Sequence, residues 1–166
     1  MLNQADVDDF EAEAFIEAVK ENRSLLELEM SNNMIGGAEN LSSVMPDLVT
    51  GARALAGMLR SPDVKLQALK LDWNMIRLAG GVDLCASVGH NNTLTYLDLS
   101  YNSLARAGGV ALGQALIPNK VLRTLRVSNN SLDAMAAFTI CAGIIENRGL
   151  LNVNLDGNPI CEQVVF

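Results

Sequence analysis

Apolar and polar residues along this chain follow one pattern of eleven positions, which occurs five times. Its third copy places apolar residues at Leu94, Leu97, Leu99 and Leu104, with Asn102 between the last two. The other copies carry asparagine at the same position, as Asn33, Asn74, Asn130 and Asn158. The last four copies begin at equal intervals along the chain, and a longer interval separates the first copy from the second. Five matches at these spacings indicate an internal structural repeat.

The first half of each copy predicts a short strand followed by a turn. In the third copy Leu97 and Leu99 alternate with polar residues, which is the period of a strand with one buried face. The asparagine predicts the turn, because its amide group can both donate and accept hydrogen bonds where the chain bends. We therefore expect the five asparagines to form an internal ladder that has no binding role.

After each strand the apolar residues change to helical spacing. In the third unit Val110, Leu112, Ala115 and Leu116 fall on one face of a helix. A unit of about 28 residues leaves room for a helix of about three turns, given the ~1.5 Å rise per residue. Helices are about 10 Å wide, whereas neighbouring strands lie about 4.8 Å apart, so the stack should curve with its strands on the inside.

The pattern L-x-x-L-x-L-x-x-N-x-L in units of this length resembles the leucine-rich repeats of the ribonuclease-inhibitor-like class. Residues 94–102, Leu-Thr-Tyr-Leu-Asp-Leu-Ser-Tyr-Asn, carry the resemblance most clearly. It implies an α/β solenoid shaped as a horseshoe arc, with a parallel sheet on the concave face and helices on the convex face. The class includes cytosolic immune receptors, the GTPase-activating protein of Ran and scaffolds of cilia, and the resemblance points to no particular member.

The whole chain, residues 1–166, is predicted to be a single leucine-rich repeat domain. Residues 1–24 contain the helix of an incomplete, strandless unit, expected at about 6–22. The complete repeats start near residues 25, 66, 94, 122 and 150. The chain stops at Phe166, where the next helix would start, which favours a fragment of a longer array or docking against another chain.

The first unit is 13 residues longer than the others, and the excess forms an insertion at about 36–49. Its residues are too apolar for a plain flexible loop, as shown by Leu41, Val44, Met45, Leu48 and Val49. We expect a short extra helix packed on the convex side, because exposed apolar patches of that size are uncommon in monomers. The alternative is a projecting element that docks a partner.

Charge is concentrated at the N-terminus. Residues 1–30 hold nine acidic and two basic groups, and their net charge of −7 equals that of the whole chain. We interpret this as the polar outer face of a solenoid cap, with steering of a basic partner as the alternative. The sequence has no basic stripe that could neutralise phosphates, so nucleic acid is not expected as a ligand.

Further features favour a cytoplasmic location without a membrane span. The sequence has no apolar run long enough to cross a bilayer as a helix, and its N-terminus lacks the pattern of a secretory signal. Cys85 and Cys141 occupy the same helix column two repeats apart, too far for a disulfide. We expect both to be free and buried, and Cys161 to be exposed.

No catalytic or cofactor-binding set is recognisable. The only histidine, His90, has no cysteine or carboxylate nearby at the spacing of metal ligands. The glycine pairs Gly80-Gly81 and Gly108-Gly109 are not followed by Lys-Ser/Thr, as a phosphate-binding loop requires. The sequence therefore predicts neither an enzyme nor a protein that binds a cofactor or metal.

Two columns of residues across the strands supply candidate binding residues. One reads Glu29, Lys70, Asp98, Arg126 and Asn154, and we expect Lys70 and Asp98 to neutralise each other. The other reads Asn32, Trp73, Tyr101, Asn129 and Gly157. Trp73 is the only tryptophan, and the only tyrosines are Tyr101 and Tyr96. Three aromatic residues on a polar face resemble an interaction hot spot; alternatively, the rings only cover the sheet rim.

The sequence therefore predicts a non-enzymatic protein-interaction module or scaffold that binds a protein partner through its concave face. The candidate partner-binding residues are Trp73, Tyr101, Tyr96, Lys70, Asp98, Asp72, Glu29 and Arg126. The alternative is a regulatory arm acting on an enzyme, either a GTPase activator or the sensor arm of an immune receptor. Arg77 and Arg106 could be the loop arginines of an activator, although neither lies in a matching motif. A sensor arm would need a nucleotide-binding domain upstream.

Overall fold

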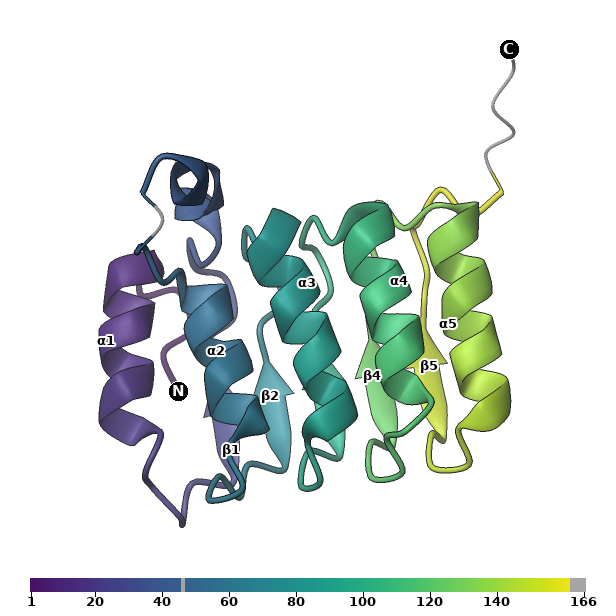
Figure 1. The fold of residues 1–166 in the computed structure, drawn as a ribbon, viewed down its shortest axis with the longest axis horizontal. Helices are drawn as coiled ribbons and strands as arrows, with labels where there is room; N and C mark the ends of the chain where they lie inside the picture. The colour runs from purple at the N-terminus through teal and green to yellow at the C-terminus, as the bar shows by residue number, and fades with distance from the viewer. Residues whose placement is uncertain (46, 162–166) are drawn as a thin grey trace.

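Five short strands form one parallel sheet in the computed structural model, which describes residues 1–45 and 47–161. The order of the strands in the sheet is their order in the sequence (Figure 1). The strands are β1 (Glu27–Glu29), β2 (Ala68–Lys70), β3 (Tyr96–Asp98), β4 (Thr124–Arg126) and β5 (Asn152–Asn154). Each copy of the eleven-position pattern thus supplies one strand, and a helix lies between each pair of consecutive strands.

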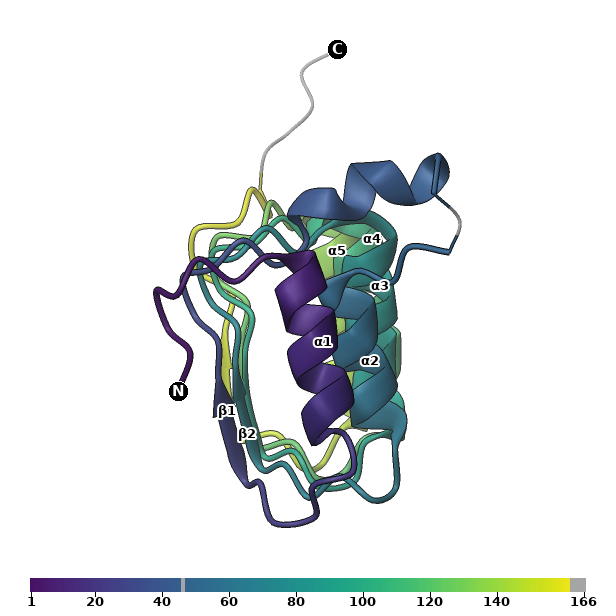
Figure 2. The same ribbon diagram turned by 90° about the vertical axis from the view of Figure 1, so that its left-hand side faces the viewer.

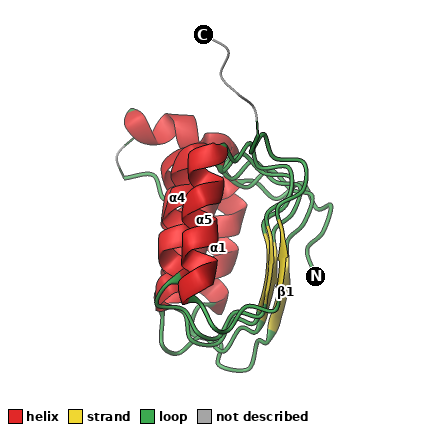
Figure 3. Cartoon of the chain, turned by 90° about the vertical axis from the view of Figure 1, so that its right-hand side faces the viewer, coloured by secondary structure: helices red, strands yellow, loops and turns green. Residues whose placement is uncertain are grey.

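The helices form a second layer on one face of the sheet (Figures 2 and 3). The α-helices are α1 (Asp9–Val19), α2 (Gly51–Arg60), α3 (Leu78–Ser87), α4 (Ala105–Leu116) and α5 (Ala134–Glu146). Two short 3-10 helices are also present, η1 (Gly37–Ser43) and η2 (Val88–His90). Within the described residues, no helix covers the other face of the sheet, which we call the open face.

The core lies between the two layers and consists of the apolar positions of the repeated pattern. Leu69 pairs in register with Leu28 on one side and Leu97 on the other, and all three are at most 4% exposed. Burying one leucine side chain stabilises a fold by roughly 1.5–3 kcal/mol, so these aligned rows hold the stack together. Val153, in the last strand of the same row, is 37% exposed.

The asparagine of each copy lies inside the turn after its strand, as predicted. The Asn102 amide donates to the carbonyls of Leu71 (2.9 Å) and Leu99 (3.0 Å), and its oxygen accepts from the Ile76 amide (2.9 Å). Each such side chain joins its own unit to the unit before it, which confirms the internal ladder. Equivalent bonds are made by Asn33, Asn74, Asn130 and Asn158.

A second asparagine ladder, outside the eleven-position pattern, lies where α3, α4 and α5 return to the next strands. The Asn119 amide donates to the carbonyls of Val88 (2.8 Å) and Asn91 (3.1 Å), and its oxygen accepts from the Leu122 amide (2.9 Å). The sequence carries a signal for this ladder, because an asparagine stands three residues before the first leucine of four copies. These residues are Asn22, Asn91, Asn119 and Asn147.

The N-terminal segment forms part of a unit beside β1, where the sequence predicted a helix without a strand. The Leu2 amide donates to the Glu29 carbonyl (2.8 Å). The Asn33 side chain donates to the Leu2 carbonyl (2.8 Å) and accepts from the Val7 amide (3.0 Å). Residues 2–7 therefore make the bonds that the turn of each later unit makes, a turn that the sequence did not predict here. No strand precedes α1 in the described residues, as predicted.

Helix α1 is shorter than the expected 6–22, and it begins after Asp8, whose side chain caps its first turn. The next residue, Asp9, is 2% exposed and anchors the two ends of the insertion. Its carboxylate accepts hydrogen bonds from the amides of Gly36 (2.8 Å), Ala38 (2.7 Å) and Gly51 (2.8 Å). A single carboxylate thus fixes where the insertion leaves the first unit and where it returns.

The insertion contains the short helix η1, which lies at the edge of the molecule where the helices begin (Figure 2). Leu48 is buried, as expected. The expectation of a packed insertion is wrong for the other apolar residues, which are at least 40% exposed: Leu41, Val44, Met45 and Val49. The Asp9 carboxylate holds the backbone here, so the insertion keeps its place without burying all of these side chains.

Cys85 and Cys141 differ in burial, although they share a helix column. Cys85 is fully buried, and burial raises the pKa of its thiol to about 12. Cys141 is exposed, so its predicted burial is wrong, whereas Cys161 is exposed as expected. Gly113 occupies the same position in the unit between those of the two cysteines. A Cβ added at Gly113 would lie 2.5 Å from backbone atoms of α5, so this helix position faces the helix of the next unit. Helix α5 is the last helix of the described residues, so its own column stays uncovered.

Candidate functional site

The residue just before the asparagine of each copy has a left-handed backbone conformation, and these residues, with Gln4 at the matching place in the N-terminal segment, form a row beside the open face. Their φ angles lie between 52° and 68°. In chain order this left-handed row is Gln4, Asn32, Trp73, Tyr101, Asn129 and Gly157. Asparagine and glycine adopt this conformation readily, whereas for a bulky residue it is unfavourable by about 1 kcal/mol or more. Trp73 and Tyr101 are therefore strained where other units use better suited residues.

The Trp73 and Tyr101 rings are stacked on each other. Their centroids lie 4.0 Å apart and their planes differ by 8°. Such a pair stabilises a fold by about 0.5–1.5 kcal/mol, which offsets part of the backbone strain. Trp73 remains 55% exposed and Tyr101 41% exposed, so burial in the core does not explain these residues. The pair presents a large aromatic surface at the rim of the open face.

Two polar pockets border the stack, and Asp72 lines both. The pocket of about 660 Å³ beside Trp73 is lined by Asn3, Gln4, Ser31, Asn32, Asp72 and Trp73. The pocket of about 370 Å³ beside Tyr101 includes Asp98, Arg126 and Asp156 in its lining. The Ser31 hydroxyl donates to the Asp72 carboxylate at 2.5 Å, which fixes this side chain between the pockets.

Charged side chains of the strands pair in two separate groups. The Lys70 ammonium lies 3.1 Å from the Glu27 carboxylate and hydrogen-bonds to Glu29. This bond lowers the pKa of Glu29 and, with Glu27, raises the pKa of Lys70. Asp98 lies 3.9 Å from the Arg126 guanidinium. The expected pairing of Lys70 with Asp98 is thus replaced by pairing of Lys70 with β1 and of Asp98 with β4.

Tyr96 belongs to these charged groups rather than to the aromatic stack. Its hydroxyl lies 3.4 Å from the Asp98 carboxylate, and the Lys70 ammonium lies 6.0 Å from the centroid of its ring. The eight predicted site residues therefore fall into three places. Trp73 and Tyr101 form the stack, Asp72 lines both pockets, and the other five lie in the charged groups.

The eight predicted residues do not include several that line the pockets, namely Asn3, Gln4, Asn32, Asn129 and Asp156. Gln4 has the same left-handed conformation as Asn32, because the N-terminal segment repeats the turn of the later units. A signal for this exists in Leu2-x-x-Ala5-x-Val7, which matches the end of the pattern except that alanine replaces asparagine. The missing asparagine hid this turn.

Comparisons with known proteins agree with this fold. A family profile described as "Leucine Rich repeat" matches residues 90–113. Among solved structures 47 chains match, including one titled "Leiomodin-1 Actin-Binding Site 2 (ABS2)". That similarity has a TM-score of 0.66 at 20% sequence identity and covers 88% of this chain and 78% of that chain. The fold is an α/β leucine-rich repeat solenoid. A comparison with curated protein sequences found no significant match.

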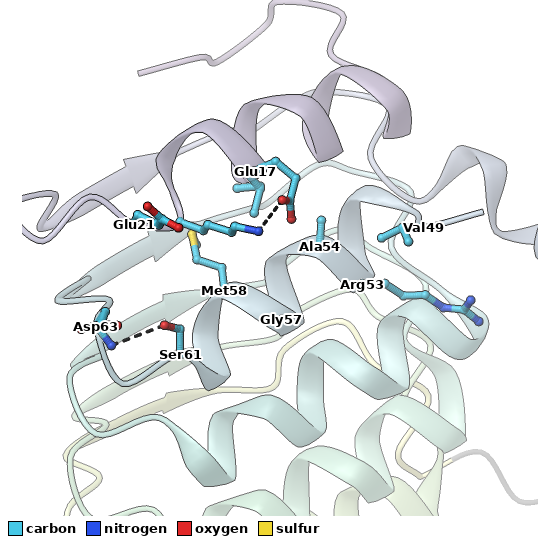
Figure 4. Close-up of a pocket in the computed structure, with 11 residues that line it drawn as sticks. Glu17, Glu21, Val49, Arg53, Ala54, Gly57, Met58, Ser61 and Asp63 are labelled. Atoms are coloured by element: carbon cyan, nitrogen blue, oxygen red, sulfur yellow. Dashed lines mark hydrogen bonds and ion pairs between the residues drawn. The ribbon is translucent and has the colours of Figure 1, made fainter. Parts of the chain in front are cut away.

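A groove of about 450 Å³ separates the first two helices of the solenoid (Figure 4). It exists because α2 carries small residues there: a Cβ added at Gly57 would have no atom within 4 Å. Its lining has both signs of charge, and Lys20 pairs with Glu17 inside it at 2.5 Å. Two other charged lining residues pair with residues outside the groove, Asp63 with Arg23 (2.9 Å) and Arg53 with Asp83 (3.7 Å). The groove also lacks an aromatic anchor, so it is a weaker candidate than the stack.

The exposed residues of the insertion form another candidate surface. Phe10 is 52% exposed and Met45 50%, and both line a pocket of about 420 Å³. The rest of the lining is Glu13, Asp47, Leu48 and Val49. This pocket is more apolar than those beside the stack, and we call it the insertion pocket. It is the main competitor for partner binding on the solenoid.

The described residues offer little for other chemistry. Among them, no three or more histidine, cysteine or acidic side chains are grouped to hold a metal ion. Nor does that part of the chain contain a helix long and apolar enough to cross a membrane. The loop arginines are engaged within the solenoid: Arg77 donates to the Gly37 carbonyl (3.1 Å), and Arg106 pairs with Asp133 (2.5 Å).

Proposed function

We propose that this solenoid is a non-enzymatic protein-interaction module that binds a protein partner through the open, concave face of its sheet. The Trp73–Tyr101 stack is the anchor of this interface. The observation that carries the proposal is that both aromatic residues are strained and exposed at a position where three of the other four units use asparagine or glycine and the fourth uses Gln4. Strained residues gather at functional sites, and exposed tryptophan and tyrosine are typical interface anchors.

Other observations support parts of this proposal. The leiomodin-1 structure with a similar fold is titled as an actin-binding site, which agrees with a protein-binding role for such a solenoid. The length of the repeat unit and its α-helix favour the ribonuclease-inhibitor-like class, and three free cysteines favour a cytoplasmic location. The regulatory-arm alternative receives less support, because Arg77 and Arg106 both bind within the chain.

The test compares the native chain with Trp73→Asn and Phe10→Gln in affinity capture from cell extract, followed by titration of the captured partner. Asparagine suits the left-handed backbone, so Trp73→Asn removes the ring without adding strain. We expect the partner to bind the native chain and Phe10→Gln alike. Trp73→Asn should weaken its binding by about 2 kcal/mol, roughly thirtyfold.

Two results would count against the proposal. If Phe10→Gln alone loses the partner, the interface lies at the insertion pocket instead. If all three chains bind equally well, the aromatic stack is not an anchor. Far-UV circular dichroism of each variant, melted in parallel, ensures that a loss of binding does not come from unfolding.

A further inference from the structure

The open face carries more acidic than basic side chains. In its strands and the turns that follow them, the acidic residues are Glu27, Glu29, Asp72, Asp98 and Asp156, and the basic residues are Lys70 and Arg126. Both basic residues pair with carboxylates of the same face. Asp72 and Asp156 line the pockets that border the stack. The aromatic rings are thus exposed within a surface of negative potential.

The pocket beside Trp73 combines a flat ring with a carboxylate. One face of the indole is covered by Tyr101, and the remaining ring surface borders the pocket that Asp72 lines. The other lining residues carry amide and hydroxyl groups, which can accept hydrogen bonds: Asn3, Gln4, Ser31 and Asn32. A group that suits this pocket is therefore planar, positively charged and rich in hydrogen-bond donors.

The guanidinium group of arginine has these properties. It stacks on aromatic rings, of which tryptophan is the most favourable, and its planar donors match a carboxylate. A lysine ammonium is a compact, strongly hydrated charge and matches less well. An acidic segment would be repelled by Asp72 and Asp156, and no aromatic or apolar side chain would satisfy the polar lining.

We propose that the partner presents a basic, arginine-containing segment to the open face. One guanidinium group lies against the free face of Trp73 and binds the Asp72 carboxylate. This inference rests on the proposed function, because it assumes that the stack is the anchor, and it adds the chemical class of the partner. The argument for a basic partner is charge complementarity. The open face is acidic, and so is the whole chain, which has a net charge of −7.

Trp73 is the only tryptophan, so its fluorescence reports on this pocket directly. The experiment titrates the full chain with the peptide acetyl-Gly-Arg-Gly-Arg-Gly-amide at low ionic strength and follows tryptophan emission. Matched peptides carry lysine or glutamate in place of arginine. We expect saturable binding of the arginine peptide, about threefold or more weaker binding of the lysine peptide, and no saturable change with the glutamate peptide.

Two variants that change the net charge equally distinguish binding of the arginine peptide at this pocket from non-specific electrostatic attraction to the acidic chain. Asp72→Asn removes the carboxylate from the pocket, whereas Asp63→Asn removes one that pairs with Arg23 (2.9 Å) in the turn before β2. We expect Asp72→Asn to weaken the arginine peptide about fivefold and Asp63→Asn less than twofold. Equal effects of the two variants, equal binding of arginine and lysine peptides, or no saturable signal would each overturn the inference.

These outcomes are separate from those of the proposed function. If Trp73→Asn abolishes binding of the captured partner while the arginine peptide gives no saturable signal, the stack is an anchor for a partner of other chemistry. If Trp73→Asn leaves the captured partner bound, the proposed function itself fails, whatever the peptides do.

Discussion

Trp73 and Tyr101 stack with their centroids 4.0 Å apart, although each has a backbone conformation that suits asparagine or glycine. Two opposing free-energy contributions therefore meet at these residues. The left-handed backbone disfavours each bulky side chain by about 1 kcal/mol, and stacking stabilises the pair by about 0.5–1.5 kcal/mol. Because stacking offsets only part of the roughly 2 kcal/mol of strain at the two residues, the fold gains nothing from the pair, and a role in binding is the better explanation of its presence.

The first prediction is that Trp73→Asn changes the free energy of unfolding by less than about 1 kcal/mol, because the variant loses the stack but asparagine relieves the backbone strain. Leu71→Ala, at a fully buried position two residues away, should instead cost about 2–5 kcal/mol. Urea unfolding followed by circular dichroism compares the two. A loss for Trp73→Asn as large as that for Leu71→Ala would make the tryptophan structural.

The sequence predicts the regular part of this molecule well, because every copy of the pattern obeys the same constraint. Leu69 must align with Leu28 and Leu97 to bury all three, so strand order and register follow from spacing alone. The pairing of Trp73 with Tyr101 is predictable for the same reason, since both occupy one column in the turns after neighbouring strands. The repeat spacing therefore predicts both the fold and the pairing of the two aromatic residues at the centre of the candidate site.

The irregular parts were less predictable, because no repeated spacing describes them. The N-terminal turn that brings Gln4 to the pocket has alanine, Ala5, where the pattern has asparagine. The insertion depends on one buried carboxylate, Asp9, which is distant in sequence. Cys141 lies in a column that periodicity marks as buried, yet burial of that column depends on a following helix.

The second prediction concerns the asparagine ladder. Asn102→Ala should lower the free energy of unfolding by about 1–3 kcal/mol, because the Leu71 and Leu99 carbonyls and the Ile76 amide lose their partner. The matched control is Asn92→Ala, an exposed residue whose side chain makes a single bond at 3.4 Å. It should change stability by less than about 0.5 kcal/mol. Equal effects in denaturant melts would contradict a special role of the ladder.

The third prediction concerns cysteine reactivity. At pH 8 Cys141 and Cys161 should react rapidly with a thiol reagent such as iodoacetamide, because both are exposed. Cys85 should react only after unfolding, since it is fully buried and burial raises the pKa of its thiol to about 12. Mass spectrometry of the labelled peptides identifies each site. Rapid labelling of Cys85 in the native protein would contradict the packing of α3 described here.

The fourth prediction concerns pH. The Lys70 hydrogen bond lowers the pKa of Glu29 in the folded state, so ionised Glu29 stabilises the fold at pH values above its ordinary pKa of 4.5. This stabilisation is lost as the pH falls through the lowered pKa. Glu29→Gln should therefore destabilise the protein more at pH 7 than at pH 3 in urea melts. In a Lys70→Met background that difference should shrink, and an unchanged difference would exclude Lys70 as its main source.

The last prediction concerns the carboxylate that anchors the insertion. Asp9→Ala should lower the free energy of unfolding by about 3 kcal/mol, because three backbone amides lose a buried, charged acceptor. Hydrogen exchange should accelerate at those amides, which belong to Gly36, Ala38 and Gly51. The matched control, Glu21→Ala, removes an exposed acidic side chain and should have little effect on either measurement. If exchange at the three amides stays slow in Asp9→Ala, the insertion is held by other contacts, and the insertion pocket keeps its shape without this carboxylate.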